Sequence, residues 1–205
     1  MSPWDRHVVP HLVRWACGAN PVRRQRAKIV PTARGHVLEL GVGSGLNLAH
    51  YDPSRVERVL GLDPSPGLLG SARDAARAVP FDVELVEGSA ERLPFEDAAF
   101  DTVVVTYSLC SIPNVGAALA EARRVLADDG ALLFIEHGLA PDAEVSRWQR
   151  RLDPYWTVCA GGCHLDRDMP RLIEGAGFAI ESLESIYLPG IRWLNYNVWG
   201  TARPR

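Results

Sequence analysis

Short apolar runs alternate with segments that can form amphipathic helices from residue 37 to the end of the chain. Val37–Leu40 and Val59–Leu62 are bounded by turn residues, and Thr102–Thr106 is a β-branched run typical of a strand buried on both faces. Strands that alternate with helices indicate a parallel sheet covered by crossover helices. We therefore predict an α/β fold with five parallel strands and a C-terminal pair. The predicted strands span residues 37–40, 59–62, 83–86, 102–106, 131–136, 180–187 and 195–201, and the predicted helices span 67–78, 117–126 and 169–176.

A further helix is predicted ahead of the sheet. Trp4, Val8, Leu12 and Trp15 have the spacing that places apolar side chains on one face of a helix. We expect residues 1–34 to form an N-terminal helical cap within a single domain that spans residues 1–205. Three roles stay open for this helix: packing on the core, roofing a ligand site, or association with a membrane surface.

The distribution of tryptophan separates the predicted sheet from its additions. All six tryptophans lie outside residues 37–137. One interpretation is an apolar cap over the mouth of the sheet, built from the N-terminal segment and an insertion at residues 139–167. The other is that the additions need a small core of their own. The residues concerned are Trp4, Trp15, Trp148, Trp156, Trp193 and Trp199.

Composition excludes several classes of partner. The net charge of −3 gives nucleic acid binding no electrostatic support, so no nucleic acid partner is expected. Basic residues do cluster from Arg14 to Arg34, including Arg26, and we interpret them as a solvated helix face, with a site for an anionic partner as the alternative. No apolar run is long enough to span a bilayer, and the charged start of the chain does not resemble a secretory signal. These features predict a cytoplasmic protein with reduced thiols and no integral membrane segment.

The clearest chemical signal is a glycine-rich turn directly after the first predicted strand. Gly41, Gly43 and Gly45 alternate there, so backbone N–H groups can approach a ligand at the start of a helix. Asp63 ends the next strand, where a carboxylate can accept hydrogen bonds from both hydroxyls of a ribose. The pattern predicts a nucleoside cofactor, although an ordinary strand–helix turn could carry the same glycines. The spacing G-x-G-x-G differs from the G-x-G-x-x-G of dinucleotide sites, which disfavours NAD.

Two sets of residues carry a resemblance to known families. Glu39 followed by the three glycines resembles the first motif of the class I S-adenosylmethionine (SAM) methyltransferases. Leu109–Ser111, Phe134–His137 and the segment from Trp148 to Arg167 resemble the methyltransferase-like seven group of thiol S-methyltransferases, within the ubiquinone-biosynthesis-type superfamily. This resemblance implies a Rossmann-like seven-stranded methyltransferase sheet, SAM as the cofactor, and methyl transfer to a small lipophilic thiol.

Candidate site residues come from the carboxyl ends of the strands, where ligands bind in open α/β sheets. The resemblance also implies that the segment at Ser89 and Ala90 contacts the adenine, with Ser89 standing where the family usually has Asp. We assign cofactor binding to Glu39, Gly41, Gly43, Gly45, Asp63, Pro64, Ser89, Ala90 and Thr106, and candidate catalytic roles to His137, Tyr107 and Cys110.

No metal site is predicted. Cys159-x3-Cys163 followed by His164 invites comparison with zinc ligands, but structural zinc sites usually have four ligands and C-x2-C-type spacing. A buried, inert thiol is the alternative to a functional Cys110.

Several acceptors are compatible with such a cofactor. Methyl transfer from a sulfonium needs positioning and exclusion of water, and a thiol with a pKa of about 8.5 is partly ionised at neutral pH. A protein base is therefore optional for a thiol, with His137 the first candidate and His164 the second, although a lone histidine at a strand end is more often structural. The alternatives are N- or O-methylation of an amine, a phospholipid head group or a phenolic metabolite. A SAM-binding protein without catalysis is an alternative from a different class.

Overall fold

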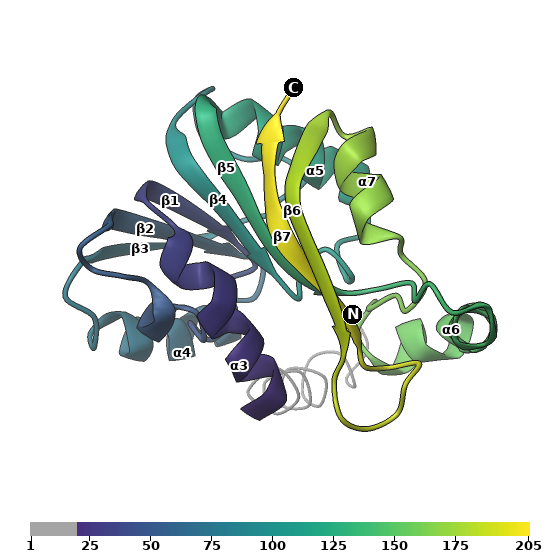
Figure 1. The fold of residues 1–205 in the computed structure, drawn as a ribbon. Helices are drawn as coiled ribbons and strands as arrows, with labels where there is room; N and C mark the ends of the chain where they lie inside the picture. Colours follow the sequence, from purple (N-terminus) through teal and green to yellow (C-terminus); the bar gives the residue numbers. More distant parts are fainter. Residues whose placement is uncertain (1–19) are drawn as a thin grey trace.

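One mixed sheet of seven strands organises the protein (Figure 1). The structure is a computed structural model that describes residues 20–205. The strand order is β3-β2-β1-β4-β5-β7-β6, with β1 to β5 parallel and β7 antiparallel to both of its neighbours. The predicted α/β sheet of seven strands is therefore confirmed. The strands are β1 (Gly35–Leu40), β2 (Val56–Asp63), β3 (Asp82–Glu87), β4 (Phe100–Thr106), β5 (Leu126–His137), β6 (Phe178–Tyr187) and β7 (Tyr196–Pro204).

Helices cover both faces of the sheet. The helices α3 (Asn20–Ile29) and α4 (Pro66–Ala76) pack on one face, and α5 (Val115–Val125) and α7 (Met169–Gly175) pack on the other. The helix α6 (Ala143–Cys159) follows β5 and lies to the side of the sheet (Figure 1). Three of these helices, α4, α5 and α7, begin after a residue whose side-chain oxygen accepts from a backbone N–H of the first turn. The short 3₁₀ turns are η1 (Val30–Thr32) and η2 (Leu48–His50).

The core is an apolar layer on each face of the sheet. Leu38 of β1 packs in one layer with Leu119 of α5 and Ile173 of α7. Val37, its neighbour in the chain, lies in the opposite layer with Ile29 of α3. Successive side chains of a strand point to opposite faces, so strands buried on both sides are apolar at consecutive positions. This explains why the central strands could be recognised as uninterrupted apolar runs.

Three features differ from the sequence predictions. The glycine turn was expected at the start of a helix, but between β1 and β2 the structure has only the 3₁₀ turn η2. The strand β5 begins at Leu126 instead of residue 131, because α5 runs directly into the strand and Leu126 already pairs with Phe100. Trp199 belongs to neither a cap nor a separate small core. It is 5% exposed in the main core, and the Lys28 ammonium lies 3.8 Å from the centre of its ring. The predicted helix over residues 4–15 lies outside the described residues.

The predicted insertion at residues 139–167 contains α6, which is tied to the sheet by a buried side chain. Gln149 accepts from the Ala140 N–H at 2.8 Å and donates to the carbonyls of Gly138 and Trp193 at 2.9 and 3.1 Å. The outer face of α6 carries exposed apolar side chains, among them Tyr155 and Val158. Within residues 20–205, no helix combines the length and the apolar character needed to cross a membrane.

Candidate functional site

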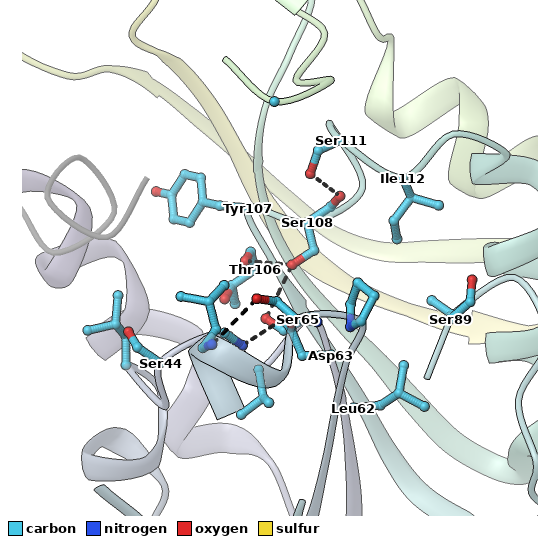
Figure 2. Close-up of a pocket in the computed structure, with 18 of the residues that line it drawn as sticks. Ser44, Leu62, Asp63, Ser65, Ser89, Thr106, Tyr107, Ser108, Ser111 and Ile112 are labelled. Carbon is cyan, nitrogen blue, oxygen red and sulfur yellow. Dashed lines mark hydrogen bonds between the residues drawn. The ribbon is translucent and has the colours of Figure 1, made fainter. Parts of the chain in front are cut away.

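A cavity of about 330 Å³ opens at the carboxyl ends of β1, β2 and β4, where the strand order reverses between β1 and β4 (Figure 2). Open α/β sheets bind their ligands at such a switch point. The cavity is lined by residues that follow four different strands. Most of the predicted site residues are brought together here. Those that line the cavity are Gly41, Gly43, Asp63, Pro64, Ser89, Ala90, Thr106 and Tyr107, whereas Glu39, Gly45, Cys110 and His137 do not line it.

The glycines of the turn differ in what they do. Gly41, Gly43 and Gly45 all have a positive φ, of 74°, 55° and 78°, a conformation that favours glycine, but their surroundings differ. A Cβ on Gly41 would also lie 2.1 Å from the Ser108 Oγ, so the chain after β4 approaches this turn closely. A Cβ on Gly45 would instead meet the Ala75 Cβ at 3.0 Å. Gly45 therefore permits packing against α4 and does not face the cavity.

Asp63 connects the end of β2 to the glycine turn. Its Oδ2 accepts from the Gly43 N–H and its Oδ1 from the Ser65 N–H, both at 2.9 Å (Figure 2). Burial raises the pKa of Asp63, and the two backbone hydrogen bonds oppose that shift. Each carboxylate oxygen can accept more than one hydrogen bond, so the side chain can hold the turn and still accept from a ligand in the cavity.

Glu39 lies behind the cavity, within a buried polar network. It is 1% exposed and accepts from the Tyr51 Oη at 2.7 Å and from the Asn47 Nδ2 at 2.9 Å. Burial raises the pKa of Glu39 to about 7, against the lowering influence of Tyr51, Arg26 and Asn47. Glu39 therefore does not line the cavity, and its hydrogen bonds tie β1 to the chain that follows the glycine turn.

Arg26 of α3 lines the cavity, and the prediction that it belongs to a solvated basic face was wrong. It is 4% exposed, and its Nη1 donates to the Asn47 Oδ1 and the Thr106 Oγ1, both at 2.6 Å. Its guanidinium also lies 5.3 Å from the centre of the Tyr107 ring. Polar partners on two distant segments offset the cost of burying this charge. The charge pattern gave no sign of this burial, because Arg26 stands among other basic residues of the same helix.

Tyr107 has a backbone conformation that is rare for a large side chain, with φ of 54°. The turn at this residue lets it line the cavity directly after β4. Its hydroxyl donates to the Asn197 Oδ1 at 2.7 Å, which joins the cavity wall to β7. The hydroxyl proton therefore already has an acceptor within the protein.

Ser89 and Ala90 lie on the β3 side of the cavity, as the adenine assignment requires. The Ser89 hydroxyl donates to the Glu91 Oε2 at 3.1 Å and accepts from the Glu91 N–H at 3.2 Å. The side chain is thus engaged in a local turn. This arrangement leaves the backbone of Ala90 as the better candidate for contact with a ligand.

Cys110 and His137 lie together outside the cavity, and they share a third partner that sequence reasoning had not joined to them. The His137 Nε2 lies 3.0 Å from the Cys163 Sγ, and the Trp156 indole donates to the same sulfur at 3.4 Å. The Cys110 Sγ, the His137 ring nitrogen and the Cys163 Sγ all lie within 4.8 Å of one another. The three residues are far apart in sequence, so no local spacing indicated this cluster.

The cluster favours a charged pair of side chains. The hydrogen bond from the Cys110 thiol is the largest influence on the pKa of Cys163; together with His137 and Trp156 it outweighs burial and holds that pKa below its usual value. Burial alone would lower the pKa of His137, but the neighbouring Cys163 outweighs it and the net shift is upward. Both shifts of pKa favour the thiolate form of Cys163 and the protonated form of His137.

The grouping of Cys159, Cys163 and His164 considered from the sequence is not formed in the fold. Cys159 is exposed at the end of α6. The His164 Nδ1 lies 2.9 Å from the Asp153 Oδ2 and does not line the cavity. His164 is therefore placed to pair with a carboxylate on α6 and not to act in the cavity.

Comparison with known proteins agrees with this geometry. The methyltransferase domain family matches residues 38–134. The chain is 34% identical over 162 residues to thiol S-methyltransferase TMT1B of Rattus norvegicus, covering 77% of this chain and 65% of the relative. It is 34% identical over 164 residues to thiol S-methyltransferase TMT1A of Homo sapiens, covering 78% of this chain and 66% of the relative. The chain thus spans slightly less than two thirds of the length of these relatives.

Solved structures share the fold at low sequence identity. The trans-methyltransferase CalH in complex with S-adenosylhomocysteine (SAH) matches with a TM-score of 0.64 and 23% identity, over 96% of this chain and 59% of that one. The [4+2]-cyclase SpnF matches with a TM-score of 0.69 and 19% identity, over 89% of this chain and 80% of that one. A cyclase and a methyltransferase with one fold show that the reaction must be argued from the site.

Proposed function

The chain belongs to the class I SAM-dependent methyltransferases, and from this premise we propose that it transfers the methyl group of SAM to a small lipophilic thiol. The observation that carries the choice of acceptor is the set of titratable groups at the cavity. Among the described residues that line it, the only side chains of this kind are Arg26, Asp63 and Tyr107. Each is already engaged by hydrogen bonds or ring contacts within the protein.

The residues at the cavity fit SAM. Asp63 offers carboxylate oxygens to the ribose hydroxyls, and the segment at Ser89 and Ala90 lies on the side that the adenine would occupy. The glycine turn and the guanidinium of Arg26 offer donors and a positive charge to the carboxylate of the methionine part. A volume of about 330 Å³ falls at the lower end of the range for small-molecule sites, about 300–1,000 Å³.

Methyl transfer from SAM to a thiol places little demand on a protein base. When bound, SAM supplies a methyl group that its sulfonium has already activated. The residues of this chain then have to orient the two reactants and keep water away from them. A thiol loses its proton more readily than an alkylammonium ion or a phenol, with a pKa of about 8.5 against about 10. A cavity without a free base therefore suits a thiol better than the other two acceptors.

An acceptor panel tests the proposal. The protein would be incubated with methyl-labelled SAM and either benzyl mercaptan, benzylamine or a cresol, which have similar size and shape. We expect methylation of the thiol to be at least about tenfold faster than that of the amine or phenol, since general-base help contributes about 10²–10⁴-fold where it is needed. Product masses identify the methylated atom. Faster methylation of the phenol or amine would overturn the choice of acceptor and leave the cofactor assignment intact.

Methylation of an amine is the second candidate. Phosphatidylethanolamine N-methyltransferase of Cereibacter sphaeroides is 34% identical to this chain over 117 residues, covering 56% of this chain and 57% of that relative. This similarity is as high as that to the thiol S-methyltransferases but extends over less of the chain. Vesicles that contain phosphatidylethanolamine should therefore be included in the panel, and transfer to the lipid amine would favour this second function.

A further inference from the structure

The cluster of Cys110, His137 and Cys163 lies at the same edge of the sheet as the cavity. Cys110 lies in the loop after β4, His137 is the last residue of β5, and Cys163 follows α6. Each contributes one soft or borderline ligand atom, and the three atoms lie within 4.8 Å of one another. We propose that these three side chains bind a zinc ion through two thiolate sulfurs and one imidazole nitrogen.

The geometry suits zinc with a small adjustment. Zinc–sulfur bonds of about 2.3 Å and zinc–nitrogen bonds of about 2.0–2.1 Å in a tetrahedron place sulfur and nitrogen ligands about 3.6 Å apart. The His137 Nε2 and the Cys163 Sγ lie 3.0 Å apart, so they would separate by about half an ångström around the ion. Two sulfurs and one imidazole favour zinc over magnesium or calcium, which prefer oxygen ligands.

The backbone around the ligands is fixed from several sides. The Glu136 Oε1 accepts from the N–H groups of Ser108 and Leu109 at 2.7 and 2.8 Å, just before Cys110. The Arg167 guanidinium donates to the carbonyls of Leu109 and Ile112, on either side of Cys110. Hydrogen bonds of this kind hold a site in the arrangement that its ion requires.

The segment that carries Cys163 is also tied directly to Cys110. The N–H of His164 donates to the Cys110 carbonyl at 2.8 Å. Because this backbone bond joins the residue after Cys163 to Cys110 itself, the two thiols are held in register without a disulfide. A preformed pair of sulfurs on two separate segments is the costly part of a metal site, and here the fold provides it.

A second group of possible ligands lacks these properties. Asp153, His164 and Asp166 also lie within 4.8 Å of one another. However, His164 already pairs with Asp153, and the other oxygen of Asp153 accepts from the Leu165 N–H at 2.6 Å. The two carboxylate oxygens of Asp153 therefore stabilise the local fold of the chain after α6. We therefore use His164 as a control and not as a ligand.

The place of the cluster suggests what the ion does, and this step rests on the proposed function. Three protein ligands leave the fourth position of a tetrahedral zinc ion open, as in catalytic zinc sites. Cys110 immediately precedes Ser111, and Cys163 is two residues from Gly161; Ser111 and Gly161 both line the cavity. An acceptor thiol can take the fourth position when its sulfur displaces a zinc-bound water and its proton passes to solvent. The ion would then hold the acceptor as a thiolate beside the cavity.

Metal binding can be tested without the reaction. The reduced protein would be stripped with a chelator and titrated with Co²⁺, whose thiolate charge-transfer bands and tetrahedral d–d bands report sulfur ligands directly. Zn²⁺ would then be added to displace the cobalt. We expect one equivalent of Co²⁺ with both sets of bands, and loss of the bands on addition of one equivalent of Zn²⁺.

Single variants assign the ligands. Cys110→Ser, His137→Gln and Cys163→Ser should each weaken Zn²⁺ binding by more than about 100-fold, because each removes a direct ligand. Cys159→Ser and His164→Gln are the matched controls, with the same chemistry just outside the cluster, and should bind as the wild type does. Circular dichroism and SAH binding would show that each variant is folded. A wild type without thiolate bands, or controls as weak as the cluster variants, would overturn the site.

The role of the ion is tested separately. Benzyl mercaptan added to the Co²⁺ protein should shift the d–d bands as a third sulfur enters, whereas its methyl thioether should not shift them. An unchanged spectrum would refute the acceptor role. If the spectrum shifts but labelled SAM methylates no thiol, the proposed function fails and the metal site stands. If thiols are methylated equally fast with and without zinc, the metal site does not take part in acceptor binding.

Discussion

The two sides of the cavity are built in different ways. We refer to Gly41, Gly43 and Asp63 as the glycine side, and to Cys110, His137 and Cys163 as the cysteine side. The glycine side is joined by a hydrogen bond between residues 20 positions apart, from the Gly43 N–H to Asp63. The cysteine side combines the loop after β4, the last residue of β5 and the segment after α6, and its closest contact joins His137 to Cys163, 26 positions apart. The glycine side lies within one stretch of chain, from the end of β1 through the 3₁₀ turn η2 to the end of β2, whereas the cysteine side needs three separate segments of the fold.

The difference teaches where function can vary within this fold. The glycine side uses backbone N–H groups, and its shape is fixed by glycine conformations and by one carboxylate. The cysteine side uses side chains, which can change without disturbing a strand. We therefore expect the glycine side to determine the cofactor and the cysteine side to influence the acceptor. Four predictions follow from this division, in order of decreasing effect.

The largest effect should come from closing the glycine turn. Gly41→Ala forces a Cβ to within 2.1 Å of the Ser108 Oγ and 2.7 Å of its Cβ, at φ of 74°. We expect the free energy of unfolding to fall by about 2–5 kcal/mol, from backbone strain and overpacking together. Gly43→Ala is the matched control, because its new Cβ would have no neighbour closer than 3.9 Å. It should cost only the backbone strain, about 1–2 kcal/mol. Urea unfolding of the two variants without ligand measures the difference, and equal losses would contradict the close approach of Ser108.

The next effect concerns pH and the buried carboxyl behind the glycine turn. The pKa of Glu39 is raised from 4.5 to about 7, so the folded protein keeps a proton that the unfolded chain releases. Stability from this group is present below about pH 4.5 and is lost as the pH rises through about 7. The loss amounts to about 3 kcal/mol over that interval.

Glu39→Gln cannot titrate, so its unfolding free energy should lack this decline between pH 4.5 and 7. Glu84→Gln, on the exposed side of β3, is the control and should follow the wild type. Denaturant unfolding measured across that pH range separates the two. A wild type and a Glu39→Gln variant with parallel profiles would show that Glu39 is already ionised in the folded protein.

A smaller effect should follow from removing the carboxylate of the glycine side. Asp63→Ala deletes the acceptor for the Gly43 N–H and the proposed acceptor for the ribose hydroxyls. We expect SAH affinity to fall by about 2 kcal/mol, or roughly 30-fold, as for the loss of a charge-assisted hydrogen bond. Asp74→Ala, an exposed position on α4, should bind SAH as the wild type does. Calorimetry on both variants checks this, and equal affinities would remove Asp63 from the cofactor site.

The sequence was sufficient where neighbouring residues determine the structure. The strands, the turn at Gly41 and Gly43, and the place of Asp63 all follow from apolar runs and glycine spacing. The bond from Arg26 to Thr106 spans 80 positions, and nothing near Arg26 in the chain indicates that its charge is buried. The packing of α3 on the sheet decides such contacts, so they required the structure.

Contacts between distant segments also explain why the sequence did not indicate the partners of Cys163. Spacing along the chain placed Cys163 near Cys159 and His164, a grouping that we compared with zinc ligands and did not adopt. In the fold, the end of α6 turns Cys159 outward, and Cys163 meets the ends of β4 and β5 instead. Separation in sequence therefore did not indicate the partners that Cys163 has in the fold.

The smallest effect is expected at Tyr107, where the two sides meet. The Arg26 guanidinium lies 5.3 Å from the centre of its ring, and its hydroxyl donates to the Asn197 Oδ1 on β7. Tyr107→Phe keeps the ring and removes one hydrogen bond at 2.7 Å, so the unfolding free energy should fall by about 1 kcal/mol.

Because the Tyr107 hydroxyl already donates within the protein, it is poorly placed to serve as a base. Turnover should therefore fall by less than the roughly 10²–10⁴-fold that the loss of a general base causes. Asn197→Ala removes the other partner and separates the two roles: a hydroxyl that only positions the cavity wall should give similar turnover losses in both variants. A loss of about 10³-fold in Tyr107→Phe alone would instead make Tyr107 a catalytic residue.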